Sequence, residues 1–200
     1  MVSGLQQFKS LNNTDLIKLL SDGAVGVLPT DTVYGLVAAA DNEQAVERLY
    51  KLKSRASNPG PVIAGNIDQL VELGIPRRYL KAVEQYWPGS VSIEIPHDLK
   101  YLNQGTGRQA FRVVDNPEVK DLLNKTGPLV TTSANPPGGK TATTLKQAEK
   151  YFDDQVDFYV DGGDLSKREA STIIRIVDDA VEVVRQGSVK IDEASGLVID

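Results

Sequence analysis

The chain has 200 residues, of which 40% are hydrophobic and 24% are charged, an ordinary composition for a globular domain. It contains no cysteine, which excludes a disulfide scaffold, a thiol nucleophile and cysteine-ligated zinc. The formal net charge of −5 argues against a basic field over the whole domain of the kind that binds nucleic acid. No apolar run approaches the ~20 residues that a membrane helix needs. The N-terminus lacks the pattern of a secretory signal, so we expect a cytoplasmic protein without a membrane anchor.

Helical patterns alternate with short apolar runs, without a linker or an internal repeat between them. Apolar spacing and capping residues predict helices over 14–20, 41–52, 66–73, 77–87, 117–124 and 144–151. Short apolar or alternating runs predict strands over 24–28, 61–64, 90–95, 109–114, 128–133, 158–160, 172–177 and 181–185. The last two read as a hairpin. We therefore predict an α/β domain with a twisted sheet of mixed parallel and antiparallel strands, flanked by helices.

Two polar segments about eighty residues apart stand out. Lys53-Ser54-Arg55 closes the helix predicted over 41–52, and Ser133-Ala134-Asn135 closes the strand predicted over 128–133. Together they offer two cations, a hydroxyl and an amide, which suit a polyphosphate. They contain no obvious general base, so they indicate a site that binds and positions a nucleotide. The alternative for the two cations is that they offset the helix dipole at its C-terminal end.

The turn after the first predicted strand is a second candidate. Pro29-Thr-Asp-Thr-Val-Tyr-Gly35 places small hydroxyl residues at the end of a strand, where α/β proteins commonly bind ligands. The alternative is a turn whose side chains satisfy its own backbone. Arg108 and Arg112 would share one face of a strand, and an arginine held there could clamp a carboxylate or a phosphate with two hydrogen bonds. For each arginine the alternative is a surface cation on an edge strand.

Two other features argue against well-known chemistries. Gly138-Gly-Lys-Thr141 follows a strand and precedes a helix, as a phosphate-binding P-loop does, but the earlier glycine of that motif is Ala134 here. Pro136 and Pro137 also remove N–H donors, so we expect a flexible loop near a nucleotide rather than a P-loop. His97 is the single histidine of the sequence and is expected in a solvated loop. Neither a histidine-rich metal site nor a Ser–His triad is therefore predicted.

Taken in chain order, these segments resemble the YrdC/Sua5 family of threonylcarbamoyl-AMP synthases. The matching motifs are Pro29-Thr-Asp-Thr-Val-Tyr-Gly-Leu36, Lys53-Ser-Arg55, Trp87-Pro-Gly89, Phe111-Arg-Val113, Thr132-Ser-Ala-Asn135 and Ala170-Ser-Thr-Ile173. The K-x-R and S-x-N pair within this framework is the specific part. The resemblance implies one YrdC-like domain over 1–200, with a core at about 14–190 and without the C-terminal domain of Sua5.

The resemblance implies an ATP-dependent nucleotidyltransferase. The family joins L-threonine, bicarbonate or CO2, and ATP into threonylcarbamoyl-AMP and releases diphosphate, and the product serves t6A37 modification of tRNA. Phosphoryl-type transfer of this kind depends mainly on positioning and charge stabilisation, which suits a site without a histidine base. Mg2+ would accompany ATP rather than occupy a protein metal site. Proteins that transfer the t6A group are further expected partners, whereas the acidic composition stands against binding of tRNA by the chain itself.

Carried over position by position, the family motifs imply a role for each matching side chain. The ATP site is implied at Lys53, Arg55, Arg108, Ser133, Asn135, Thr141 and Arg185. Four of these residues form the implied catalytic set, namely Lys53, Arg55, Ser133 and Asn135. The threonine site is implied at Thr32, Arg112, Thr131 and Ser171, with Arg112 facing the carboxylate of the amino acid.

Two positions depart from the family pattern. Pro59 occupies a position that is usually lysine or asparagine, unless Asn58 takes its place, and Ala64 replaces a common histidine. Both departures are expected beside the substrate pocket. They favour an alternative in which the chain is a catalytically weakened YrdC-like paralogue that acts as an RNA-binding or regulatory module.

Overall fold

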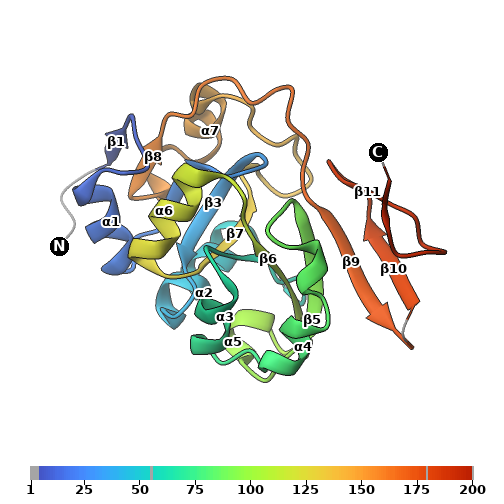
Figure 1. Cartoon of the computed structure of the whole chain (residues 1–200). Coiled ribbons are helices and arrows are strands. Elements are labelled where there is room, and N and C mark those ends of the chain that lie inside the picture. The colour runs from blue at the N-terminus through green and yellow to red at the C-terminus, as the bar shows by residue number, and fades with distance from the viewer. Residues whose placement is uncertain (1–4, 55, 179, 200) are drawn as a thin grey trace.

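A computed structural model describes residues 5–54, 56–178 and 180–199 (Figure 1). The helices are α1 (Thr14–Ser21), α2 (Glu43–Leu52), α3 (Ile67–Glu72), α4 (Arg77–Lys81), α5 (Lys100–Asn103), α6 (Pro117–Thr126) and α7 (Leu145–Phe152). The strands are β1 (Gln6–Phe8), β2 (Gly26–Pro29), β3 (Tyr34–Ala39), β4 (Val62–Ala64), β5 (Val91–Pro96), β6 (Arg108–Val113), β7 (Leu129–Ser133), β8 (Phe158–Val160), β9 (Thr172–Val177), β10 (Ala180–Arg185), β11 (Lys190–Ile191) and β12 (Val198–Ile199). None of the helices within the described ranges is long and apolar enough to cross a membrane.

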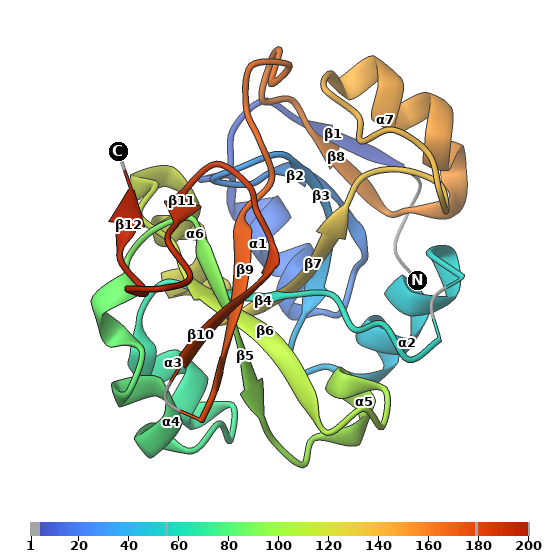
Figure 2. The same cartoon turned by 90° about the vertical axis from the view of Figure 1, so that its right-hand side faces the viewer.

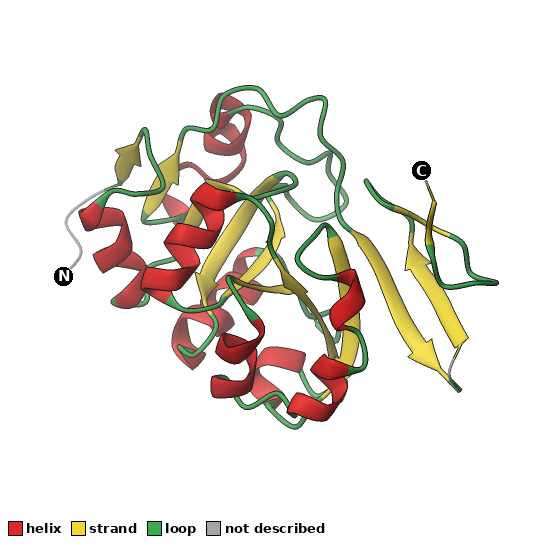
Figure 3. Ribbon diagram, viewed as in Figure 1, coloured by secondary structure: helices red, strands yellow, loops and turns green. Residues whose placement is uncertain are grey.

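Ten of these strands form one sheet in the order β1-β8-β2-β3-β7-β4-β6-β5-β9-β10. Strands β1 and β8, β8 and β2, β4 and β6, and β5 and β9 pair in parallel. The other neighbours in the sheet pair antiparallel, so the predicted mixed sheet is confirmed. The predicted hairpin is also confirmed: β9 and β10 stand at the right-hand edge of the molecule, beyond the helices (Figure 3).

The sheet separates two apolar cores, and β3 shows how. Leu36 and Ala38 belong to one buried cluster together with side chains of α2 and α7, whereas Val37 and Ala39 belong to the other together with side chains of α1 and α6. This alternation follows because successive side chains of a strand point to opposite faces. In Figure 2 the helices accordingly surround the sheet instead of gathering on one side of it.

The sequence prediction missed or misplaced several elements. It omitted β1, β3, α5, β11 and β12. The helix predicted over 77–87 is α4 followed by a separate 3-10 turn at Glu84–Tyr86. The helix predicted over 41–52 begins only at Glu43, and Asn42 is its cap, because the side chain of Asn42 accepts a hydrogen bond from the backbone N–H of Ala45 at 3.0 Å.

His97 is not the solvated loop residue that the sequence predicted. It is 6% exposed, and its ring meets the ring of Phe111 edge to face, with the centroids 5.3 Å apart. Its Nδ1 accepts a hydrogen bond from the backbone N–H of Leu99 at 3.3 Å, so the neutral ring carries its proton on Nε2. Burial lowers the pKa of His97 and outweighs the nearby Gln109 side chain and the carboxylate of Asp98, which both act in the opposite direction.

We expect His97 to make the free energy of unfolding fall as the pH is lowered through about 6.5, the ordinary pKa of histidine. Because the pKa of His97 is lower in the folded chain, the unfolded chain binds the proton first and is favoured at acid pH. The effect vanishes well above the ordinary pKa and levels off below the pKa of the folded chain. Urea titrations of the wild type and His97→Gln, between about pH 5 and 8, measure it. If the free energies of unfolding of the wild type and His97→Gln differed by the same amount at every pH, the expectation would be contradicted.

Candidate functional site

The end of α2 and the end of β7 meet through Lys53. Its Nζ donates hydrogen bonds to the carbonyl oxygen of Ser133 at 2.8 Å, to the carbonyl oxygen of Asn135 at 2.5 Å and to Oδ1 of Asn135 at 2.8 Å. The hydroxyl of Ser133 donates to the same Oδ1 at 2.6 Å. Lys53 is only 3% exposed. The structure thus brings the K-x-R and S-x-N segments together at a buried junction, although Arg55 lies outside the described residues.

A cavity of about 270 Å3, here called the junction cavity, opens beside these contacts. It is lined by Lys53, Ser54, Ala56, Asn58, Asn135, Pro137 and Gly138. Nδ2 of Asn135 donates to the carbonyl oxygen of Gly139 at 2.6 Å, which holds the glycine loop against the end of β7. The loop after the S-x-N segment therefore forms part of the wall of the junction cavity.

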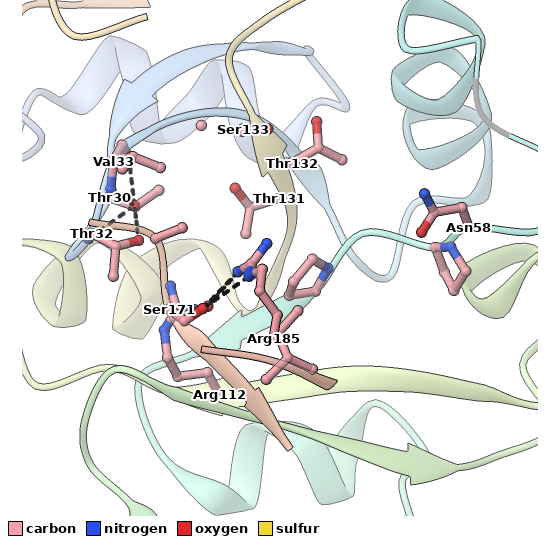
Figure 4. Close-up of a pocket in the computed structure, with 15 residues that line it drawn as sticks. Thr30, Thr32, Val33, Asn58, Arg112, Thr131, Thr132, Ser133, Ser171 and Arg185 are labelled. Carbon is pink, nitrogen blue, oxygen red and sulfur yellow. Dashed lines mark hydrogen bonds between the residues drawn. The ribbon is translucent and has the colours of Figure 1, made fainter. Parts of the chain in front are cut away.

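A second cavity of about 220 Å3, here called the inner cavity, lies on the other side of Asn58 (Figure 4). Its lining comes from five parts of the chain: Thr30, Thr32, Val33 and Gly35; Asn58, Pro59 and Pro61; Arg112; Thr131, Thr132 and Ser133; and Ala170, Ser171, Ile173 and Arg185. In Figure 4 the Arg185 side chain extends into the space between Ser171 and Thr131. Asn58 lines both cavities, so they adjoin at this residue.

The turn between β2 and β3 builds one wall of the inner cavity. Oγ1 of Thr30 accepts hydrogen bonds from the backbone N–H groups of Thr32 and Val33, each at 3.2 Å, and donates to the carbonyl oxygen of Val33 at 2.7 Å. The turn thus satisfies its own backbone and also presents Thr32 to the cavity. A Cβ atom on Gly35 would lie 2.5 Å from Oγ1 of Thr131, so glycine at this position is what allows Thr131 to sit there.

Arg112 forms the floor of the inner cavity in a fixed orientation. Its Nε donates to Oδ2 of Asp31 at 3.1 Å and its Nη2 to Oδ1 at 2.7 Å, a two-pronged ion pair whose side chains are 2% and 5% exposed. Its Nη1 donates to Oγ of Ser92 at 2.9 Å. Arg112 is therefore a buried cation held by β5 and by the β2–β3 turn, not a surface cation on an edge strand.

The C-terminal hairpin completes the inner cavity. Oγ of Ser171 lies 3.0 Å from Oγ of Ser92, and the carbonyl oxygen of Ser171 accepts hydrogen bonds from Nε and Nη2 of Arg185 at 3.2 and 2.7 Å. A chain of polar contacts therefore runs from the β2–β3 turn through Arg112 to Arg185. It carries two guanidinium groups, and that of Arg112 is paired with the carboxylate of Asp31.

The predicted site residues separate into two groups and a remainder. The inner cavity contains Thr32, Arg112, Thr131, Ser133, Ser171 and Arg185, and the junction cavity contains Lys53 and Asn135. Arg108, exposed at the start of β6, and Thr141 line neither cavity. Of the two departures from the family pattern, Pro59 does lie at the inner cavity. Ala64 does not: it is fully buried in the apolar core.

Two residues that bond to Arg112 were not among the predicted site residues. Asp31 belongs to the 29–35 turn that was singled out, but the sequence gives no sign that its carboxylate meets Arg112. Ser92 lies in a strand that reads as half-buried, and its alternation with apolar neighbours indicates a solvated side chain, yet it is fully buried. Within the described ranges, no group of three or more histidine, cysteine, aspartate or glutamate side chains is placed to hold a metal ion.

Comparisons with known proteins identify relatives of this chain. The Sua5/YciO/YrdC family, described as telomere recombination, matches residues 18–187. A threonylcarbamoyl-AMP synthase of Pseudomonas fluorescens is 38% identical over 159 residues, which is 76% of this chain and 85% of the relative.

Two solved structures share the fold. Sua5 of P. abyssi in complex with L-threonine matches with a TM-score of 0.81 and 24% identity, over 96% of this chain and 60% of that one. E. coli YciO matches with a TM-score of 0.76 and 22% identity, over 93% of this chain and 96% of that one. With most of its length matched by the family and by the Pseudomonas relative, this chain belongs to the Sua5/YciO/YrdC family.

Proposed function

We propose that this chain is a threonylcarbamoyl-AMP synthase, a nucleotidyltransferase that acts on L-threonine, bicarbonate or CO2, and ATP. The observation that carries the proposal is the pair of adjoining polar cavities that share Asn58. The inner cavity, at about 220 Å3, suits a ligand as small as an amino acid, since pockets for drug-sized ligands run from about 300 Å3 upward. The identity to the Pseudomonas synthase, over most of both chains, supports the same activity.

We assign the amino acid to the inner cavity. Arg112 is a guanidinium held at the floor, and a carboxylate is the ligand that its planar donors recognise best. Thr32, Thr131 and Ser171 place hydroxyl groups in the same cavity, where they can bond the hydroxyl and amine of threonine. The P. abyssi relative in the solved complex also binds L-threonine.

We assign the phosphates of ATP to the junction cavity. Lys53 and Asn135 line it, Ser133 lies next to them at the inner cavity, and Arg55, two residues beyond Lys53, is proposed to join them. Mg2+ would enter with the nucleotide, bound mainly by phosphate oxygens. Because Arg108 and Thr141 line neither cavity, we leave them out of the proposed contacts.

The reaction then takes place near Asn58, between the two ligands. The neutral amine of threonine adds to CO2 and loses a proton to give a carbamate, and a carbamate oxygen attacks the α-phosphorus of ATP while the bond to diphosphate breaks. Arg185, which lies in the inner cavity and not beside Lys53, is suited to offset the negative charge of the carbamate. Alignment and charge stabilisation supply the catalysis. In the cytoplasm the adenylate would pass to the proteins that carry out t6A transfer to tRNA.

The direct test is diphosphate release from ATP by the purified protein. We expect release that depends on both threonine and bicarbonate, and a rate at least tenfold lower for Lys53→Ala, because a charge-assisted contact contributes about 1.5–3 kcal/mol. Lys51→Ala is the matched control, since Lys51 lies on the same helix with 80% of its side chain exposed. Release that needs no threonine, or equal rates for Lys53→Ala and the wild type, would refute the proposal.

The division of the site between two cavities gives a second expectation. Thr32→Val, which removes a hydroxyl from the inner cavity at nearly constant shape, should raise the KM for threonine about tenfold and leave the KM for ATP within about twofold. Asn135→Ala, at the junction cavity, should raise the KM for ATP about tenfold and leave the KM for threonine within about twofold. Steady-state kinetics with each substrate varied in turn measure both. If both variants shifted both KM values equally, the assignment of ligands to cavities would be wrong.

A further inference from the structure

We propose that Asp31 is a positioning residue, which holds Arg112 in the orientation that receives the carboxylate of the amino acid. This inference rests on the proposed function of the inner cavity. Asp31 and Arg112 come from the β2–β3 turn and from β6, and their two hydrogen bonds, at 2.7 and 3.1 Å, fix the guanidinium plane. With side chains 5% and 2% exposed, the pair lies out of solvent, so its geometry is not that of a mobile surface contact.

The pairing leaves the guanidinium able to bind a second carboxylate. A guanidinium has five N–H donors. The bonds to Asp31 use the one on Nε and one on Nη2, and the bond to Ser92 uses one on Nη1. One N–H on each terminal nitrogen remains beyond these three bonds. A carboxylate can accept from one or both of these donors without displacing Asp31, so Arg112 can serve Asp31 and the amino acid at the same time.

The location of Asp31 favours this shared arrangement over displacement of Asp31 by the substrate. Arg112 lines the inner cavity, whereas Asp31 lines a neighbouring cavity that is bordered by Lys167, Arg168 and Lys190. Thr32, the next residue in the turn, lines both. Asp31 is not among the residues that line the inner cavity, so an amino acid bound there need not displace its carboxylate.

A merely structural counter-ion makes the opposite prediction for binding. If Asp31 only neutralised Arg112, its loss would leave a buried cation without compensation. The carboxylate of the amino acid would then supply the missing charge, and threonine would bind as tightly as before or more tightly. If Asp31 orients Arg112, its loss weakens threonine binding in spite of the extra positive charge. The direction of the change in affinity separates the two roles.

The experiment is calorimetric titration of the full chain with L-threonine and, separately, with ATP. For Asp31→Asn we expect at least tenfold weaker threonine binding and an ATP affinity within about twofold of the wild type. Asp31→Glu retains the charge but moves the carboxylate by one methylene, so its threonine affinity should fall between the two. Asp41→Asn, at an exposed position, is the control for loss of one negative charge and should bind both ligands normally.

A double-mutant cycle tests whether Asp31 acts through Arg112. In an Arg112→Gln background, Asp31→Asn should weaken threonine binding by no more than about twofold further, because the group that it positions is gone. If the two substitutions acted independently, their fold-losses of threonine affinity would multiply, and that result would overturn the proposal. Unchanged or tighter threonine binding by Asp31→Asn would also overturn it. If Asp31→Asn does not fold, Asp31→Glu decides, since it keeps the counter-charge, and full affinity in that variant would equally overturn the proposal.

These outcomes remain distinct from failure of the proposed function. If the wild-type chain binds no threonine, the assignment of the inner cavity is wrong, and the role of Asp31 falls with it. If the wild type binds threonine and Asp31→Asn binds it equally well, the proposed function stands and only the positioning role is wrong.

Discussion

The ammonium group of Lys53 is the contact on which the geometry of the site depends. By donating to three oxygens of Ser133 and Asn135, it fixes the end of α2 against the end of β7. Gly60, further along the chain, then lies very close alongside β7, because a Cβ atom there would lie 2.5 Å from the carbonyl oxygen of Thr131. The segment between these two attachment points carries Asn58, which lines both cavities. One buried cation and one glycine thus determine where the inner and junction cavities adjoin.

The inner cavity is held together by polar contacts rather than by apolar packing. Buried polar groups are costly unless they are bonded, and here hydroxyls, carbonyls and one carboxylate surround Arg112 and Arg185. Such a network gives a narrow range of side-chain positions, because every displaced group loses a partner. That is the property that the proposed function requires, because it relies on the positioning of the substrates.

The sequence predicted the mixed sheet of the fold, and it predicted a site from the order of its motifs. Motif order placed Thr32, Lys53, Arg112 and Asn135 in one site, and all four line the two adjoining cavities. It could not reveal the pairing of Asp31 with Arg112, because a contact over 81 residues leaves no local pattern. Strand β3 was missed for a different reason: all of its side chains are buried, so neither the period of a half-exposed strand nor a run of β-branched residues marks it. The burial of His97 was not predicted, because the polar residues around it in the sequence give no sign that it packs against the ring of Phe111 in the fold.

The C-terminal hairpin has a consequence for biosynthesis. Ser171 and Arg185 form a wall of the inner cavity, and β9 reaches its place by pairing with β5, some eighty residues earlier in the chain. Contacts over such separations form late, because the long loop between them must close first. A chain still attached to the ribosome can fold its first strands and helices as they appear, but its inner cavity lacks one wall until Arg185 has been synthesised. The inner cavity is therefore among the last parts of the described fold to be completed.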